Sequence, residues 1–322
     1  MPYPREIYNK AMRRLEARRD DAVMKADILK QEIMEELPRV AEIQRGLAQI
    51  GLEISRLFLY RDNTQEKVAE LRSRSNALVQ ERTSILQKAG YDPDAMKPHY
   101  TCPACEDKGF IDGRMCQCHK TILKEIMREE LEQLAPLEEC TFDNFDTRYY
   151  SSVPLDNGIV PRQKAEKVAD TAHRYAQNFS MDSKNLLFIG GAGLGKTHLS
   201  LAIMNVVVNK GYYCCYGTAQ NICDDLQSEQ FGRDEGLVYN KKQVMECDLL
   251  VLDDLGTEVN NQYSVATLYN IINTRILAGR PTVISTNFKF SALEKRYDKR
   301  ITSRLTGEYV PQYLFGNDIR NM

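Results

Sequence analysis

The sequence predicts an α/β protein in which an α-helical N-terminal domain and a small cysteine-rich segment precede a domain built on a parallel sheet. Three observations support this prediction. Residues 5–87 are rich in Glu, Lys, Arg, Leu and Ala, residues 102–120 hold four closely spaced cysteines, and short apolar runs alternate with helical segments from Phe142 onward. We expect the domain boundaries to fall at residues 1–97, 98–135 and 136–322.

Composition indicates a soluble globular protein. The chain has 322 residues, of which 43% are apolar, and a formal net charge of −2 at pH 7. A core of ordinary size can therefore form, and no general electrostatic attraction to nucleic acid is expected. No apolar run has membrane-spanning length, and the N-terminus is too charged for a secretory leader. We therefore expect a cytoplasmic protein whose nine cysteines are thiols or metal ligands rather than disulfides.

The N-terminal region shows helical periodicity. Its clearest apolar stripe has steps of four, three, four and three residues and consists of Ile43, Leu47, Ile50, Ile54 and Leu57. Pro38 is expected in the first turn of that helix, and Asn63 with Glu66 resembles the cap of a following helix that Gly90 ends. The pattern predicts a helical hairpin or bundle. It leaves two functions open, a spacer or dimerising coil and a docking domain for the helices of a partner.

The cysteine-rich segment has the spacing of a metal site. Cys102 and Cys105 form a C-x-x-C pair, Cys116 and Cys118 form a C-x-C pair, and a glycine-containing loop joins the two pairs. Four such thiolates supply the tetrahedral ligand set of a structural Zn²⁺ site, with His119 as an alternative to Cys118. The competing interpretation is free or redox-active thiols. The other cysteines are expected to be small core residues: Cys140, Cys214, Cys215, Cys223 and Cys247.

A phosphate-binding loop follows the first apolar run of the C-terminal region. Residues 185–203, NLLFIGGAGLGKTHLSLAI, combine a strand, the motif G-x-x-x-x-G-K-[ST] and a helix. Backbone N–H groups in such a loop surround phosphates, Lys196 reaches the β- and γ-phosphates, and the Thr197 hydroxyl binds Mg²⁺. The expected nucleotide-contacting residues of the loop are Gly190, Gly191, Ala192, Gly193, Leu194, Gly195, Lys196, Thr197 and His198.

Two further strands are predicted to end in polar side chains beside that loop. Residues 248–256, DLLVLDDLG, place Asp253 at a strand end, where it is expected to bind Mg²⁺, and Asp254 next to it, where it is expected to orient or activate water. Residues 281–287, PTVISTN, end in Asn287, which is expected to hold the water near the γ-phosphate. An aspartate at position 254 is one methylene shorter than glutamate, which indicates slow or partner-dependent hydrolysis.

These motifs together resemble a known family. GGAGLGKTHL, LLVLDDLG, TVISTN, RITSRL and FGNDIR occur in the order found in AAA+ ATPases of the DnaC/DnaI type, the bacterial replicative-helicase loaders, and IstB transposition helpers carry similar motifs. The resemblance covers roughly residues 140–322. It implies an AAA+ P-loop NTPase fold with a parallel sheet, preceded here by the α-helical N-terminal domain and the small zinc-binding segment.

The resemblance also implies roles for arginines and for DNA-facing residues. It makes Arg304 the first and Arg300 the second candidate for an arginine finger that reaches a neighbouring subunit, and it makes Arg320 a sensor of the nucleotide in its own subunit. Contact with single-stranded DNA is implied for three further residues, at which stacking and polar contacts are physically reasonable. They are Phe231, Asn261 and Tyr263.

The function implied is an ATP-dependent loader of the replicative helicase onto single-stranded DNA. Its cofactors are ATP, Mg²⁺ and Zn²⁺, and its partners are the replicative hexameric helicase, single-stranded DNA and further copies of the chain. ATP hydrolysis is expected to be weak and stimulated by assembly or by single-stranded DNA. Two alternatives remain open from the sequence, an IstB-like ATPase helper of a transposase and a nucleotide-binding scaffold that does not hydrolyse ATP.

Overall fold

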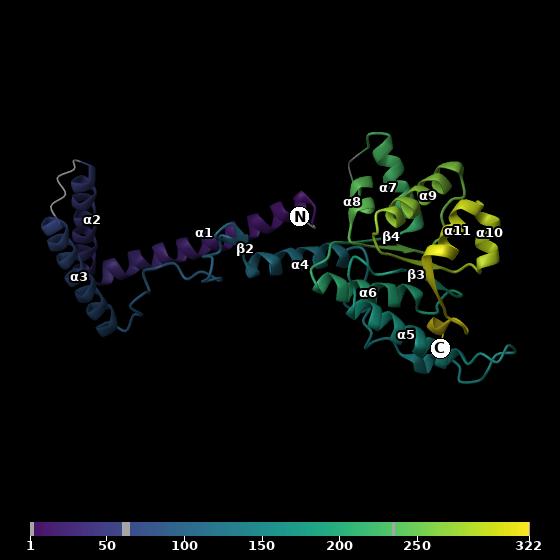
Figure 1. Ribbon diagram of the computed structural model, residues 1–322. Helices are drawn as coiled ribbons and strands as arrows, with labels where there is room; N and C mark the ends of the chain where they lie inside the picture. The colour runs from purple at the N-terminus through teal and green to yellow at the C-terminus, as the bar shows by residue number, and fades with distance from the viewer. Residues whose placement is uncertain (1–2, 60–64, 234–235, 322) are drawn as a thin grey trace. The chain divides into compact units, whose positions relative to one another are not determined.

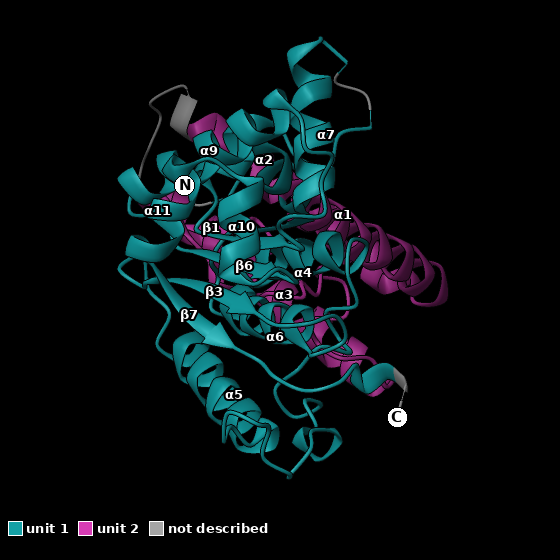
Figure 2. Ribbon diagram, turned by 90° about the vertical axis from the view of Figure 1, so that its right-hand side faces the viewer, with its two compact units in different colours: residues 1–11, 120–322 teal, residues 12–119 magenta. Residues whose placement is uncertain are grey.

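The structure is a computed structural model that describes residues 3–59, 65–233 and 236–321 (Figure 1). The chain divides into two compact units, residues 12–119 and residues 1–11 with 120–322 (Figure 2). Within the described residues, no helix combines the length and the apolar character needed to cross a membrane.

The unit of residues 12–119 is helical, as predicted. It contains most of α1 (Arg5–Glu36), then α2 (Pro38–Leu59) and α3 (Gln65–Lys88), and Figure 1 shows α2 and α3 side by side as a hairpin. Pro38 begins α2, which confirms the expected start of that helix. Gly90 follows α3 with a φ of 86°, the left-handed conformation that commonly ends a helix. The proposed Asn63 cap lies outside the described residues.

Apolar residues from separate segments form the core of this helical unit. Ile33, Val40 and Leu86 are fully buried and pack together with Ala95. In the predicted stripe of α2, Ile43 and Ile50 are buried, and the other members of the stripe are half-buried. The periodicity therefore predicted the buried face of the hairpin.

The segment after the hairpin contains little regular structure. Strands β1 (Phe110–Ile111) and β2 (Arg114–Met115) form a short antiparallel pair, and α4 (Gln117–Glu132) follows. Left-handed backbone at Glu106, Asp107 and Gly109 turns the chain before β1. These turns bring the two ends of the segment close together.

A parallel sheet forms the centre of the other unit. Its five strands lie in the order β4 (Cys214–Thr218), β5 (Leu249–Asp253), β6 (Thr282–Thr286), β3 (Asn185–Ile189) and β7 (Tyr309–Tyr313). Every residue of β5 and β6 is buried, as expected for central strands of a sheet covered on both faces. The alternation of strands and helices predicted from the sequence is confirmed.

Helices cover both faces of this sheet (Figure 1). One face carries α5 (Pro161–Gln177) and α6 (Lys196–Asn209). The other carries α7 (Ala219–Gln230), α8 (Lys241–Glu246), α9 (Gln262–Leu277), α10 (Phe290–Arg296) and α11 (Lys299–Glu308). Short 3₁₀ turns occur at Thr147–Tyr149 and Ile319–Asn321.

The strand register places the predicted site residues at one edge of the sheet. Leu187 pairs with Ile284, and Ile284 pairs with Leu252, so β3, β6 and β5 end at the same level. The cysteines that were expected to be core residues are all buried, which confirms that prediction: Cys140, Cys214, Cys215, Cys223 and Cys247.

Candidate nucleotide site and cysteine cluster

The loop between β3 and α6 has the conformation of a phosphate-binding loop. Gly193 and Gly195 have φ values of 67° and 72°, which side-chain-bearing residues rarely adopt. A Cβ atom at Gly195 would also lie 2.6 Å from the Phe145 ring. Because Gly195 caps the N-terminus of α6, the first N–H groups of that helix face the loop and favour an anion there.

Lys196 lies in this loop and is held by two oxygen atoms. Its Nζ donates to the Gly191 carbonyl oxygen at 2.7 Å and to Asn287 Oδ1 at 2.6 Å. Burial lowers the pKa of the ammonium group, and the carboxylates of Asp254 and Asp253 act in the opposite direction. A desolvated ammonium group with neutral partners is suited to bind a phosphate.

Asp253 is the centre of a hydrogen-bond network at the end of β5. The Thr197 hydroxyl donates to its two carboxylate oxygens at 3.1 and 2.9 Å, Tyr216 OH donates at 3.2 Å, and the Ser285 hydroxyl donates as well. Mg²⁺ binds oxygen ligands at about 2.1 Å in octahedral geometry, so adjacent ligands are about 3 Å apart. The separation of the Thr197 and Asp253 oxygens therefore fits a shared Mg²⁺.

Asp254 and Asn287 lie beside this pair. Asn287 Nδ2 donates to Asp254 Oδ1 at 3.2 Å, and the backbone N–H of Asp254 donates to Ser285 Oγ at 3.0 Å. Burial raises the pKa of Asp254, and the negative charge of Asp253 raises it further. The structure thus brings together all the strand-end residues that the sequence singled out.

A cavity of about 340 Å³ connects these groups with the C-terminal segment. Residues 192–198, Asp254, Asn287, Ile319 and Arg320 line it. Arg320 is 68% exposed and forms an ion pair with Asp318 at 2.6 Å. The Asp318 carboxylate in turn lies against Gly193, where an added Cβ would be 1.8 Å from its oxygen. Asp318, Ile319 and Arg320 therefore lie beside the phosphate-binding loop.

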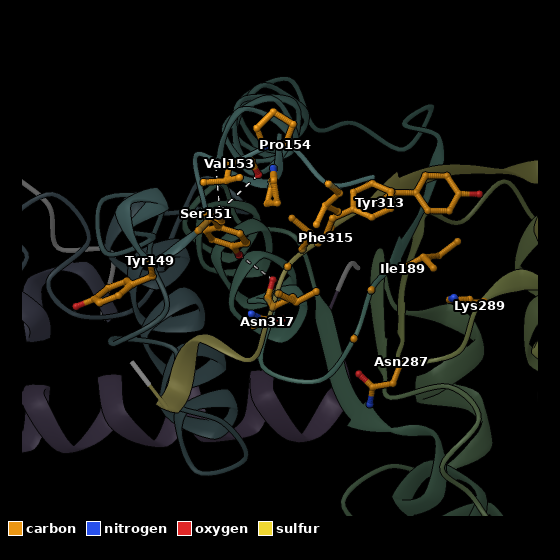
Figure 3. A pocket seen from close by; sticks show the side chains of 18 of the residues that line it. Tyr149, Ser151, Val153, Pro154, Ile189, Asn287, Lys289, Tyr313, Phe315 and Asn317 are labelled. Atoms are coloured by element: carbon orange, nitrogen blue, oxygen red, sulfur yellow. Dashed lines mark hydrogen bonds between the residues drawn. The ribbon is translucent and has the colours of Figure 1, made fainter. Parts of the chain in front are cut away.

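A larger, mainly apolar cavity of about 710 Å³ adjoins the loop (Figure 3). It shares Leu194 and Asn287 with the smaller cavity. Tyr149, Tyr313 and Phe315 contribute rings to its wall, and the rings of Tyr313 and Phe315 are stacked with centroids 6.2 Å apart. Its size and lining suit a flat heteroaromatic group attached to the phosphates.

His198 is placed differently from the other loop residues. Its Nε2 lies 2.7 Å from the Thr141 carbonyl oxygen, and its ring packs against Phe145 with centroids 5.5 Å apart. The residue borders the smaller cavity, but its side chain also ties α6 to the preceding segment.

The two finger candidates lie on one face of α11, as their spacing predicts. The guanidinium groups of Arg300 and Arg304 lie 5.0 and 4.7 Å from the centroid of the Tyr269 ring. Arg304 also donates to Asn273 Oδ1 at 2.6 Å and to Tyr269 OH at 3.0 Å, whereas Arg300 pairs with Asp298. Arg304 is therefore the more firmly oriented of the two.

The DNA-contact candidates have unequal environments. Phe231 is 68% exposed at the end of α7, which suits a ring that stacks on a base. Asn261 instead caps α9, because its side chain accepts a hydrogen bond from the Ser264 backbone N–H at 2.8 Å. Tyr263 is half-buried in the first turn of α9.

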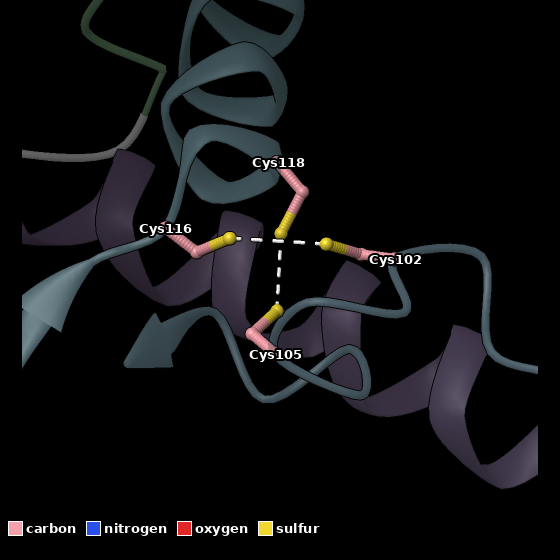
Figure 4. Close-up of side chains that lie close together, drawn as sticks. All are labelled: Cys102, Cys105, Cys116 and Cys118. Carbon is pink, nitrogen blue, oxygen red and sulfur yellow. Dashed lines mark hydrogen bonds between the residues drawn. The ribbon is translucent and has the colours of Figure 1, made fainter. Parts of the chain in front are cut away.

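The four predicted cysteines converge on one point in the unit of residues 12–119 (Figure 4). All four sulfur atoms lie within 4.8 Å of one another, with 3.8 Å between Cys102 and Cys116 and 3.4 Å between Cys105 and Cys118. With a Zn–S distance of about 2.3 Å, sulfurs at tetrahedral corners are about 3.8 Å apart. The donor set and its dimensions therefore fit Zn²⁺.

Neighbouring groups hold the cysteine cluster in place. The Gly109 backbone N–H donates to Cys105 Sγ at 3.3 Å, and the Asp107 carboxylate accepts from the N–H groups of Thr101 and Cys102 at 2.8 and 3.0 Å. His119 is outside the cluster, and its ring packs edge-on against Phe110. The cluster thus consists of the four cysteines.

Several residues of the nucleotide site had not been identified from the sequence. Ser285 and Tyr216, which donate to Asp253, lie in strands where a polar side chain amid apolar neighbours was the only available signal. The rings around the larger cavity come from segments far apart in the chain and carried no motif.

The fold and this site together have the layout of a P-loop nucleotide-binding domain. Residues 161–306 match a family model described as IstB-like ATP binding protein. The match includes the phosphate-binding loop, the acidic strand and Arg304.

Relatives named as helicase loaders are similar over about half of this chain. The replicative helicase loader DnaC of Buchnera aphidicola subsp. Baizongia pistaciae is 25% identical over 160 residues, which are 48% of this chain and 64% of that protein. DnaC of Escherichia coli K12 is 25% identical over 179 residues, 55% of this chain and 72% of that protein. The recognised resemblance to the DnaC type is thereby confirmed. The chain spans less than two thirds of the first of these relatives.

Among solved structures, the crystal structure of the DnaC helicase loader is 21% identical and has a TM-score of 0.46. The similarity covers 56% of this chain and 99% of that chain.

Proposed function

We propose that this protein is an ATP-dependent loader of the replicative DNA helicase onto single-stranded DNA. The observation that carries the proposal is the convergence of Lys196, Asp253 and Asn287 on one phosphate-binding loop, in a domain similar to proteins named replicative helicase loader DnaC. Lys196 and the polar side chains at the ends of β5 and β6 form a site whose contacts change when a γ-phosphate binds or leaves.

The nucleotide is held by two parts of the site. The loop N–H groups, the N-terminus of α6 and Lys196 bind the phosphates, and the apolar cavity beside Leu194 receives the base. Thr197 and Asp253 would hold Mg²⁺, and the ion would supply positive charge beside the phosphate oxygens. Asp254, hydrogen-bonded to Asn287, accepts a proton from the attacking water or orients it.

Hydrolysis depends on assembly in this proposal. The Arg304 guanidinium is held on the surface of α11 by Tyr269 and Asn273, where it can enter the site of a neighbouring copy of the chain. An arginine supplied by a neighbour stabilises transition-state charge only when the copies associate. ATP hydrolysis is therefore slow in the single subunit and is stimulated by assembly. Arg320 acts as a sensor of the nucleotide in its own subunit.

The N-terminal helices and the cysteine segment bind the helicase. Four thiolates holding Zn²⁺ would stabilise a segment that lacks a large apolar core and give the partner a rigid surface. The ATPase unit binds single-stranded DNA, and Phe231 is the residue that stacks on a base. Asn261 and Tyr263, at the start of α9, are the other two contact residues.

A loading assay tests this proposal. The full-length protein, the hexameric replicative helicase of the same host and a fluorescent single-stranded circle are mixed with ATP, and helicase bound to DNA is measured after removal of free protein. We expect helicase on the DNA with wild-type protein and ATP, and little with Lys196→Ala. Equal loading without the protein, or with Lys196→Ala, contradicts the proposal.

The description of the matching family model favours one alternative client. An IstB-like protein that helps a transposase would share the same ATP site. Replacing the helicase with a transposase in a co-sedimentation assay on DNA distinguishes the two clients. A scaffold without hydrolysis would bind ATP yet release no phosphate at any protein concentration.

A further inference from the structure

A buried carboxylate lies in the loop that follows Asp253 and Asp254 at the end of β5. The Glu258 side chain is only 1% exposed, and both of its carboxylate oxygens accept hydrogen bonds from the protein. Its Oε2 accepts from the Gly256 backbone N–H at 2.9 Å, and its Oε1 accepts from Tyr297 OH at 2.5 Å. Burying a carboxylate away from water destabilises the folded protein unless hydrogen bonds and an opposite charge offset the lost hydration.

Arg296 completes this arrangement. Its Nε and Nη2 atoms each lie 3.3 Å from Glu258 Oε1, and Nη2 also donates to the Glu258 backbone carbonyl oxygen. The Arg296 side chain is 22% exposed, so the ion pair is largely shielded from water. Such charge-assisted bonds are stronger than neutral ones.

On one side, Glu258 is tied to the nucleotide site. The Gly256 that it binds follows Asp254 and has a φ of 105°. A Cβ on Gly256 would lie 2.5 Å from the ring of Phe288, the residue after Asn287. The Arg296 guanidinium lies 5.9 Å from the centroid of the same ring. Movement of the Asp254–Asn287 pair would therefore be transmitted to Glu258.

On the other side, Glu258 is tied to the helix that carries the finger candidates. Tyr297 ends α10, and the following residue, Asp298, caps α11 by accepting from the backbone N–H groups of Arg300 and Ile301. Asp298 alone therefore separates Tyr297 from Lys299, the first residue of α11. The position of Tyr297 therefore sets the position of Arg304 on α11.

We propose that Glu258 is a positioning residue that couples the γ-phosphate side of the nucleotide site to the finger-bearing helix α11 of the same subunit. Asp254 and Asn287 are close in sequence to Gly256 and Phe288, which contact each other and link the site to Glu258. Glu258 in turn binds Tyr297 and Arg296, which directly precede α11. A subunit that senses its own nucleotide would thus adjust the arginine that it offers to its neighbour. This inference rests on the proposed function, since it needs assembly-stimulated hydrolysis.

Glu258→Gln tests the coupling with little change of shape. The amide oxygen still accepts one hydrogen bond, but the charge that holds Arg296 is removed. ATP affinity is measured by calorimetry, and phosphate release is measured at low and high protein concentration and with single-stranded DNA. Glu294→Gln, on an exposed position of α10, is the matched control. We expect the dissociation constant for ATP to change less than about twofold and stimulated kcat to fall about tenfold, as for a lost buried charge-assisted bond. The control should behave as wild type.

Arg296→Gln removes the same ion pair from the other side, so it keeps the test decisive if Glu258→Gln does not fold. The double variant should be no slower than either single variant, because both remove one interaction. Unchanged stimulation in a folded variant overturns the inference. The inference is also overturned if a variant binds ATP more weakly but its hydrolysis is stimulated to the same degree, because that result indicates a structural role alone.

The wild-type protein separates this inference from the proposed function. If its turnover responds neither to concentration nor to DNA, the finger proposal fails and the coupling fails with it. If wild type and Glu258→Gln are stimulated equally, only the coupling is overturned.

Discussion

The nucleotide site and the cysteine cluster are built by different means. The nucleotide site lies at the ends of buried strands, so the apolar packing of a five-stranded sheet positions Lys196 and Asp253 before any ligand arrives. The cysteine cluster lies in a segment of turns with a two-stranded ribbon, and its four sulfur atoms lie within 4.8 Å of one another. One site is organised by a core, and the other is a set of ligand atoms whose spacing fits Zn²⁺.

Loss of one thiolate gives the largest expected effect. We expect Cys105→Ser to abolish stoichiometric zinc and to unfold the segment around the cluster, because structural zinc sites contribute about 10 kcal/mol or more to folding. ATP affinity should stay within about twofold of wild type, since the sheet core is separate. Elemental analysis and calorimetry measure the two quantities. Cys140→Ala, at a buried cysteine outside the cluster, is the control. Full zinc content in Cys105→Ser would show that the cluster is not a four-cysteine site.

Removal of the proposed finger should affect the assembled state and leave both sites intact. Arg304→Ala is expected to lower stimulated turnover by about 10³-fold, the lower end of the range for arginine fingers. ATP affinity and zinc content should not change. Phosphate release as a function of protein concentration measures the effect, with Arg233→Ala as a control outside α11. A variant that keeps its stimulation would move the finger to Arg300 or remove it from the mechanism.

Truncation of a core residue in the helical unit tests whether that unit is stabilised separately. Leu86 is fully buried against Ile33 and Val40, so Leu86→Ala should lower the free energy of unfolding of this unit by about 2–5 kcal/mol. Chemical denaturation followed by hydrogen exchange measures the loss, which should not extend to the strands of the sheet. Val79→Ala, at a 37% exposed position of the same helix, should cost much less. Equal destabilisation of the sheet would contradict separate cores.

Removal of the loop ammonium group tests the preorganised site alone. We expect Lys196→Ala to weaken ATP binding by about 100-fold, because a buried charge-assisted contact to phosphate is lost. The thermal midpoint of the nucleotide-free protein should not fall, since burial lowers the pKa of this lysine and its desolvation opposes folding. Calorimetry and thermal unfolding give these values, with the exposed Lys184→Ala as the control. Undiminished ATP affinity would refute the assignment of the phosphate loop.

Much of the molecule was predictable because its determinants are local. The phosphate loop needs glycines at positive φ directly before a helix, and both requirements are visible in consecutive residues. The cysteine pairs and the start of α2 at Pro38 depend on short spacings in the same way. The buried face of α2 followed from the periodicity of its apolar residues. For these features, residue type and spacing determine the backbone with little help from distant segments.

Other features were decided only when distant segments met. Asn287 reaches Lys196 because β6 lies between β3 and β5, an order that the chain sequence does not state. Ser285 and Tyr216 donate to Asp253 because their strands, β6 and β4, are the two neighbours of β5 in the sheet. The rings of the larger cavity come from both ends of the domain. The buried Glu258 looked like an ordinary loop residue until the sheet and α10 enclosed it. Sequence thus determined which groups carry the chemistry, and the tertiary structure decided which of them face one another, because strand order and packing fix distances between residues far apart in the chain.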